Sequence, residues 1–218
     1  MTKRLILFDL DGTLVDSAAD LAAAVNHVRA CFKLPPLSVD AVRQRVGKGA
    51  RDLMERVLPG LSDSEIEEAL CRYLEFNRVH IADYTLPYPG ISSLLDRCAA
   101  RGITLAVISN KNEALSTLLL QTLGLAHLFV RVCGGDSFPE RKPSPLPLLQ
   151  VMQELAVEPD QCLMIGDSSN DITAGRAAGI TTIGCAWGYG SDRELAEADY
   201  LIQEPEQLLS YISRRWFS

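Results

Sequence analysis

The sequence predicts the α/β fold class, with a parallel sheet covered by helices on both faces and a block of helices inserted after the first strand. Two observations lead to this prediction. Short apolar runs without polar alternation, the pattern of strands buried on both faces, alternate along the chain with helical segments. Between the first two of these runs, residues 17–83 show only helical patterns. We therefore expect a Rossmann-like core of residues 1–15 and 85–218, and a helical cap domain of residues 16–84.

The first strand is expected at residues 5–8, and it leads directly into two carboxylates, Asp9 and Asp11, followed by Gly12. In an extended chain, residues i and i+2 point the same way, so both acids can face one small volume. Two such carboxylates repel one another unless a cation lies between them or one keeps its proton. The pattern favours a metal site, although Asp11-Gly12 alone is equally typical of a β-hairpin turn.

The inserted block contains four helical segments, separated by proline and glycine breaks. They are expected at residues 20–32, 39–46, 52–58 and 62–80. Ser38 is expected to cap the second segment, and Ser62 or Asp63 the fourth. Gly47-Lys48-Gly49 interrupts the block and is either a simple helix-breaking loop or a loop that contacts a ligand.

After residue 85 the strand and helix patterns alternate. The further strands are expected at residues 103–108, 129–133, 162–165, 181–185 and 199–202. The helices are expected at residues 91–101, 113–123 and 171–178 and at the end of the chain. A further helix is expected to begin at Ser144-Pro145, with Ser144 as its N-cap and Pro145 as its first residue.

Composition excludes several functional classes. Hydrophobic residues make up 47% of the chain and charged residues 22%, which are values of a globular protein. The net charge of −7 argues against a nucleic-acid or anionic-membrane partner. We find no apolar run of transmembrane length and no signal peptide, so we expect a cytoplasmic protein. The oligomeric state is left open between a monomer and a homodimer. The six scattered cysteines and three histidines form no zinc or triad pattern.

Four expected strand ends carry polar residues, and in an open parallel sheet ligands bind beyond these ends. The segments are Asp9 with Asp11, Ser109 with Asn110, Lys142-Pro143, and Asp167 with Asp171. Taken singly, each has an ordinary explanation as a helix cap, a solvated lysine or a helix start. Their placement at one edge of the sheet favours a shared site.

In order and spacing, these four segments resemble the motifs of the haloacid dehalogenase-like superfamily, and the resemblance covers the whole chain. A helical insertion directly after the first motif is similar to that superfamily's first type of cap. Within the superfamily, the chain most resembles the phosphoglycolate phosphatase family, in residues 16–17, 47–50, 53–56 and 187–190.

The resemblance implies a phosphatase that forms an aspartyl-phosphate. Asp9 would be the nucleophile and Asp11 the general acid and base. Ser109 would hold phosphoryl oxygens, and Lys142 would offset their charge. The substrate would be a small phosphorylated metabolite, with 2-phosphoglycolate expected first.

The resemblance also implies a Mg²⁺ cofactor and further binding residues. Mg²⁺ would be held by Asp9, the backbone carbonyl of Asp11 and Asp167, with Asp171 as an additional metal or supporting residue. Gly12, Thr13 and Asn110 would contact the substrate, and Lys48 or Arg51 would reach its carboxylate as the cap closes. Trp187 and Tyr189 are expected to pack around a turn.

Other functions remain open at this point. The substrate of the phosphatase could be a sugar phosphate, a nucleotide or pyrophosphate. A phosphomutase, a phosphonatase that uses Lys48 as a Schiff base, and a non-catalytic phosphate-binding protein are the remaining alternatives. Asp11 disfavours a dehalogenase, because the dehalogenases of the superfamily lack this second acid.

Overall fold

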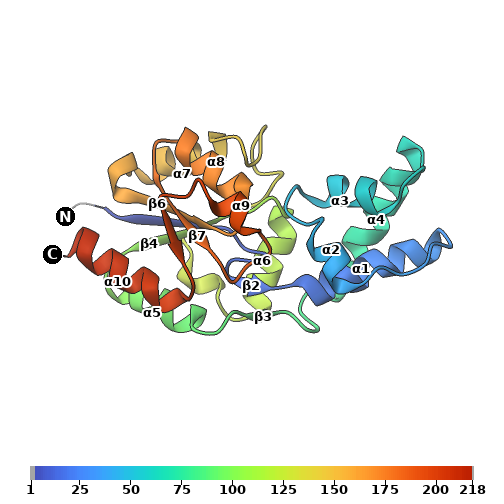
Figure 1. Ribbon diagram of the computed structural model, residues 1–218, viewed down its shortest axis with the longest axis horizontal. Helices are drawn as coiled ribbons and strands as arrows, with labels where there is room; N and C mark the ends of the chain where they lie inside the picture. The colour runs from blue at the N-terminus through green and yellow to red at the C-terminus, as the bar shows by residue number, and fades with distance from the viewer. Residues whose placement is uncertain (1–2, 218) are drawn as a thin grey trace.

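A computed structural model describes residues 3–217, and within this range it contains a central sheet of six parallel strands (Figure 1). The strands are β1 (Leu5–Phe8), β4 (Thr104–Ile108), β5 (Arg131–Cys133), β6 (Cys162–Gly166), β7 (Thr181–Cys185) and β8 (Tyr200–Ile202). Their order is β5-β4-β1-β6-β7-β8. The chain runs outward from β1 to β4 and β5 and then returns to β6 on the other side of β1, and ligands bind at such a reversal of strand order. The predicted parallel sheet is confirmed.

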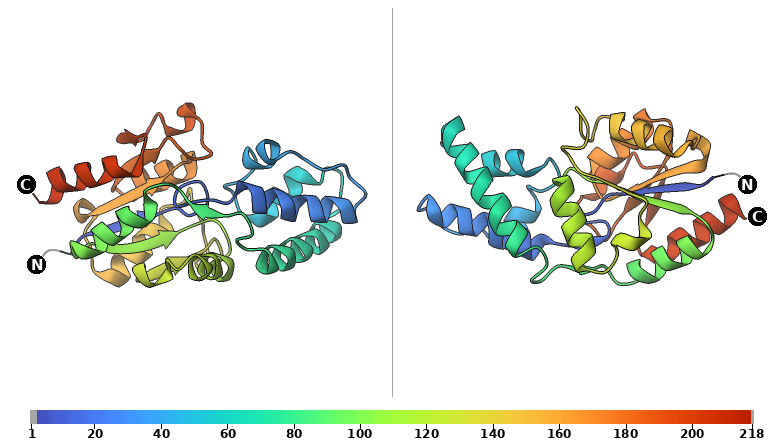
Figure 2. Two further views of the ribbon diagram at one scale, coloured as in Figure 1. Left: turned by 90° about the horizontal axis from the view of Figure 1, so that it is seen from below. Right: turned by 180° about the vertical axis from the view of Figure 1, so that it is seen from behind.

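Helices cover both faces of this sheet (Figure 2). One face packs against α5 (Ile91–Ala100), α6 (Glu113–Thr122) and α10 (Pro205–Trp216), and the other packs against α7 (Leu146–Leu155) and α8 (Ser169–Ala177). β1 shows why its apolar run has no polar alternation. Ile6 and Phe8 belong to the hydrophobic core on one face, whereas Leu5 and Leu7 belong to the core on the other. Within the described residues, none of the helices is both long enough and apolar enough to cross a bilayer.

The inserted block folds as four helices around a hydrophobic core of its own. They are α1 (Ala18–Cys31), α2 (Val39–Arg43), α3 (Ala50–Val57) and α4 (Asp63–Val79). Figure 1 shows them together at one end of the sheet. Two predicted caps are confirmed: Ser38 accepts a hydrogen bond from the Ala41 N–H, and Ser62 forms a capping box with Glu65.

The two chain crossings between the sheet and the inserted helices lie side by side. β2 (Val15–Asp16) and β3 (Leu86–Pro87) pair as a short antiparallel ladder. On α1, the buried Asp20 carboxylate accepts hydrogen bonds from the N–H groups of Tyr84 and Thr85 and from the Thr85 hydroxyl. This arrangement supports the expected division into a core of 1–15 and 85–218 and a cap of 16–84, which we retain as a proposal; residues 1, 2 and 218 lie outside the described part.

Some local expectations differ from the structure. Ser144 was expected as the N-cap of α7, but the helix begins at Leu146 and Pro145 occupies the N-cap position. α2 ends at Arg43, earlier than residue 46, because the chain turns there toward the Gly47–Gly49 loop. The sequence did not predict β2, β3 or the one-turn helix α9 (Asp192–Leu195), because elements of two to four residues are too short to show a period.

Candidate active site

The carboxyl ends of the central strands bring the predicted polar residues to one edge of the sheet. Asp9 follows β1, and its N–H donates to the Ile165 carbonyl of β6 at 2.9 Å. Ser109 follows β4, and its N–H donates to the Cys133 carbonyl of β5 at 2.9 Å. These backbone bonds continue the parallel ladders beyond the strands, so each polar side chain begins from a fixed position.

Three carboxylates form a cluster at this edge. Asp9, Asp167 and Asp171 each offer an oxygen, and these oxygens all lie within 4.8 Å of one another. The ammonium of Lys142 is buried among them, 3.0 Å from Asp9 Oδ1 and 2.6 Å from Asp171 Oδ1, and it also donates to the Ile108 carbonyl. One positive charge therefore faces three carboxyl groups. A bound cation would balance the remaining negative charge of the cluster.

Asp171 differs from the other two acids because the protein already satisfies both of its oxygens. Oδ1 pairs with Lys142, and Oδ2 accepts from the N–H and the hydroxyl of Ser168 at 3.0 and 2.7 Å. Asp171 thus caps the first turn of α8 and orients Lys142. This geometry favours the supporting role among the two that the sequence left open.

Asp167 is held by neighbours from two loops. Thr13 Oγ1 donates to its Oδ1 at 2.8 Å, and the Tyr189 N–H donates to its Oδ2 at 2.7 Å. Gly12 has a φ of +84°, and a Cβ there would lie 2.3 Å from Asp167 Oδ2, so this position requires glycine. Thr13 and Gly12 were expected to contact substrate; the structure instead places the buried Thr13 hydroxyl against Asp167, where it orients a carboxylate.

Burial and mutual repulsion make these acids hard to ionise without a further cation. Burial raises the pKa of Asp9 to about 6, with Lys142 opposing the rise. Burial, together with the charges of Asp9 and Asp171, raises the pKa of Asp167 to about 8. Burial alone would lower the pKa of Lys142, but the attraction of Asp171 and Asp9 outweighs it and the pKa is raised. The cluster is an all-oxygen donor set that lacks countercharge, so it fits a hard divalent cation.

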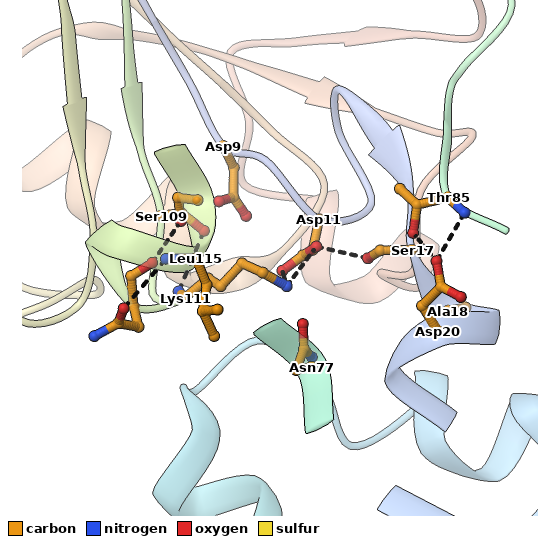
Figure 3. Close-up of polar contacts among 12 residues, drawn as sticks. Asp9, Asp11, Ser17, Ala18, Asp20, Asn77, Thr85, Ser109, Lys111 and Leu115 are labelled. Atoms are coloured by element: carbon orange, nitrogen blue, oxygen red, sulfur yellow. Dashed lines mark hydrogen bonds and ion pairs between the residues drawn. The ribbon is translucent and has the colours of Figure 1, made fainter. Parts of the chain in front are cut away.

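Asp11 points away from the cluster, toward the base of the inserted helices (Figure 3). Its Oδ1 accepts from the Ser17 hydroxyl at 2.6 Å, and its Oδ2 lies 3.3 Å from the Lys111 ammonium. The Asp11 carboxylate therefore lies outside the carboxylate cluster, although Asp11 follows Asp9 by only two residues in the sequence. The metal contact expected of Asp11 is its backbone carbonyl, so the orientation of its carboxylate does not affect that expectation.

A cavity lies between this edge of the sheet and the inserted helices. The core side contributes Asp9, Asp11 and the segment 109–112, and the inserted helices contribute mainly apolar residues. Those from the inserted block are Leu21, Val46, Gly47, Gly49, Ala50, Leu53, Tyr73, Leu74 and Asn77. A small ligand in this cavity would lie between both acids and a largely apolar wall, where charge interactions are stronger than in bulk water.

Asn110 connects this edge to the inserted block. Its Nδ2 donates to the Gly47 carbonyl at 2.9 Å and to the Lys142 carbonyl at 2.8 Å. Asn110 was expected to bind substrate; it lines the cavity, but its amide N–H groups orient the Gly47–Gly49 loop and the Lys142 backbone.

The structure does not bring the two expected cap cations to the cavity. Lys48 has an exposed side chain and is absent from the cavity lining. Arg51 is also absent from the lining, and its guanidinium pairs with Glu67 at 2.6 Å and Glu55 at 3.4 Å on the inserted helices. Arg51 is directed elsewhere because α3 turns Ala50 and Leu53, not its charges, toward the cavity.

Four residues of the site escaped the assignments made from sequence. Lys111, Ser17 and Asn77 were given no role, and Tyr189 was assigned only to packing. Tyr189 accepts a hydrogen bond from the Ser17 N–H at 2.7 Å and donates to Asp16 at 3.1 Å. The signal for Lys111 was present, since it follows Ser109 by two residues at a strand end. Tyr189 and Asn77 are distant in sequence from the motifs, and only the fold brings them in.

Comparisons with known proteins agree with this geometry. The family model for "Haloacid dehalogenase-like hydrolase" matches residues 6–185. The chain is 43% identical over 199 residues to a phosphoglycolate phosphatase of Neisseria meningitidis, covering 89% of this chain and 85% of that protein. It is 43% identical over 190 residues to a phosphoglycolate phosphatase of Aquifex aeolicus, covering 85% and 86%. A crystal structure of a predicted phosphoglycolate phosphatase from Haemophilus somnus superposes with a TM-score of 0.92 at 30% identity, covering 97% of this chain and 98% of that one.

Proposed function

Because the chain belongs to the haloacid dehalogenase-like hydrolase family, we propose that it is a Mg²⁺-dependent phosphatase that forms an aspartyl-phosphate on Asp9 and hydrolyses 2-phosphoglycolate. One observation carries the proposal. The Asp9 carboxylate lies 3.0 Å from a buried lysine ammonium, within a carboxylate cluster, and faces the cavity that it shares with Asp11. A nucleophile, a charge-neutralising group and a separate acid thus surround one small volume.

The first half of the reaction breaks the ester. A carboxylate oxygen of Asp9 attacks phosphorus, a new P–O bond forms, and the bond from phosphorus to the ester oxygen breaks. Asp11, in its protonated form, donates its proton to the departing alkoxide. Lys142 offsets the negative charge shared between the phosphoryl oxygens and Asp9, while Ser109 lies at the next strand end to hold one of those oxygens.

The second half regenerates the enzyme. The Asp11 carboxylate takes a proton from a water molecule, whose oxygen attacks phosphorus and displaces Asp9. Inorganic phosphate leaves, Asp9 returns to its free carboxylate, and Asp11 is again protonated. The hydrogen bond from Ser17 to Asp11 orients the same carboxylate for both proton transfers.

The cofactor assignment rests on the donor set. Asp9, Asp167 and the Asp11 backbone would hold Mg²⁺, which, when bound, keeps the carboxylates ionised and neutralises phosphoryl charge. Thr13 and the Tyr189 N–H hold Asp167 in a fixed position for this purpose, and Asp171 orients Lys142.

The choice of 2-phosphoglycolate has two supports. Relatives about 40% identical over most of their length are named phosphoglycolate phosphatases. In addition, the inserted helices line the cavity mainly with apolar side chains, and such a wall offers few partners for the hydroxyls of a sugar or the base of a nucleotide.

A panel of phosphorylated metabolites tests the proposal. Phosphate release by the purified protein should require Mg²⁺, and kcat/KM should be highest for 2-phosphoglycolate among small acids, sugar phosphates, nucleotides and pyrophosphate. Acid quench during turnover followed by borohydride reduction should convert residue 9 to homoserine, the product of a reduced aspartyl-phosphate. Turnover without phosphate transfer to residue 9 would contradict the mechanism, and a higher kcat/KM for a sugar phosphate would contradict the substrate.

A further inference from the structure

We propose that Lys111 is the residue that recognises the substrate's carboxylate, so that the specificity determinant lies on the core and not on the Gly47–Gly49 loop. This inference rests on the proposed function and names the contact that selects 2-phosphoglycolate. It replaces the expectation that Lys48 or Arg51 fills this role.

The first support for this role of Lys111 is the distribution of charged side chains in the cavity. Among the described residues that line it, Lys111 is the only lysine or arginine. Its side chain is 9% exposed, and its ammonium lies 3.3 Å from the Asp11 carboxylate, which is a long contact for a charged hydrogen bond. A cation in a largely apolar cavity, held only loosely by its partner, is suited to a second anionic group.

The second support is the position of the Lys111 ammonium relative to Asp11. An acid that protonates the leaving oxygen must approach it to hydrogen-bond distance, about 2.6–3.2 Å. In 2-phosphoglycolate the carboxylate carbon is two bonds from that oxygen. An ammonium next to Asp11 therefore reaches the carboxylate of a phosphorylated 2-hydroxy acid, whereas a charge farther along a longer substrate would meet the apolar cover.

The other nearby cations do not line this cavity. Lys142 is buried between Asp9 and Asp171. Arg43 lines a second hollow that also contains Asp9, Asp11 and Asp167, and there its Nη1 lies 3.0 Å from Asp40 and its guanidinium 5.6 Å from the centroid of the Tyr189 ring. Neither Lys142 nor Arg43 lines the cavity to which Lys111 contributes.

Asn77 completes the proposed subsite from the cap. It is 3% exposed, lines the same cavity, and points from α4 toward the Lys111–Asp11 pair in Figure 3. Its amide makes a long contact of 3.4 Å from Nδ2 to the Tyr73 hydroxyl. The amide oxygen faces the pair, so the cap contributes a polar group to this end of the cavity.

The test compares two substrates that differ only in this group: 2-phosphoglycolate and 2-hydroxyethyl phosphate, in which CH₂OH replaces the carboxylate. In Lys111→Met, the ratio of their kcat/KM values should fall about 100-fold, mainly through KM for 2-phosphoglycolate, because a buried charged hydrogen bond is lost. Lys111→Arg should restore most of the ratio. Lys33→Met, the same charge change on an exposed lysine outside the cavity lining, should leave the ratio unchanged.

The possible outcomes separate the inference from the proposed function. An equal loss on both substrates in Lys111→Met overturns the inference, since it would assign Lys111 to Asp11 alone, while the wild-type preference for 2-phosphoglycolate still stands. A larger loss of the ratio in Lys48→Met than in Lys111→Met also overturns it and returns the role to the loop. A wild-type protein with no preference between the two substrates overturns the proposed substrate and the inference together. Thermal melting of each variant separates a folding defect from a loss of selectivity.

Discussion

The Ser17 hydroxyl donates a hydrogen bond of 2.6 Å to Oδ1 of Asp11, and this contact joins the first helix of the inserted block to the proposed acid and base. Ser17 occupies the N-cap position of α1, yet its side chain makes no cap bond to the helix. A serine at such a position ordinarily accepts from the N–H groups of the first turn. Here the hydroxyl orients Asp11 instead. Ser17 therefore both begins the first helix of the cap and positions the proposed acid and base.

Ser17→Ala should therefore lower kcat by about tenfold with little change in KM, because the variant loses an orienting contact and no substrate contact. Thermal stability should change little, since no helix cap is removed. Steady-state kinetics with 2-phosphoglycolate provide the measurement. Ser210→Ala, on an exposed position of α10, is the matched control and should retain wild-type kcat. An unchanged kcat in Ser17→Ala would show that Asp11 needs no partner on α1.

Asp20 provides a second link between the cap and the core, and its role is structural. Its carboxylate is 4% exposed and accepts from two N–H groups and the Thr85 hydroxyl, the last at 2.6 Å. Asp20→Asn would turn an amide N–H toward these donors, and we expect a loss of about 2 kcal/mol in the free energy of unfolding. Urea unfolding measures the loss. The exposed Asp96→Asn on α5 should change the free energy by less than about 0.5 kcal/mol, and a similar small effect for Asp20→Asn would contradict the prediction.

The predicted residues that the structure brings together at the site edge share one property: each directly follows a strand or opens the next helix. Asp9, Ser109 and Asp167 lie at the ends of β1, β4 and β6, and the parallel arrangement of those strands places their ends together. An apolar run followed by a polar residue is visible in the sequence, so the grouping of Asp9 with Asp167 could be predicted from the sequence alone.

The partners that hold these residues could not be predicted in the same way. Tyr189 reaches Ser17 across 172 positions of sequence, and Thr13 reaches Asp167 across 154. Such contacts depend on how loops close over the sheet edge, and no local period encodes them. The same reason explains why the prediction for Lys48 differs from the structure. Gly47-Lys48-Gly49 has the composition of a ligand-binding loop, but its lysine is exposed in the fold, whereas Lys111 faces the cavity.

Asp9→Asn should abolish turnover, by at least about 10⁴-fold, because an amide oxygen is too weak a nucleophile to form the covalent intermediate. The variant should remain folded, since Lys142 keeps its 2.6 Å pair with Asp171. It should also melt no lower than the wild type near pH 8 without metal, because one repelling carboxylate has been removed from the cluster. Phosphate release and circular dichroism measure the two effects. Full activity in this variant would refute the nucleophile assignment.

The carboxylate cluster also predicts how stability depends on pH and metal. In the folded protein the pKa of Asp9 is raised to about 6 and that of Asp167 to about 8, from an ordinary value of 3.8. Between about pH 4 and pH 8 the folded state therefore holds more protons than the unfolded chain. Stability without metal is greatest at the acidic end of this window and falls as pH rises through it.

A divalent cation at the cluster favours the ionised carboxylates, so its stabilising effect should grow with pH. At about 100 times its Kd, Mg²⁺ should raise the Tm by about 5–10 °C near pH 8 and by clearly less near pH 5.5, measured against protein in EDTA. Asp167→Asn should reduce both the fall in Tm with pH and the response to Mg²⁺, because it removes the carboxyl whose pKa is raised most in the cluster. Asp96→Asn, outside the cluster, should behave as the wild type. An equal Mg²⁺ response at both pH values would show that proton release from these carboxyls is not linked to metal binding.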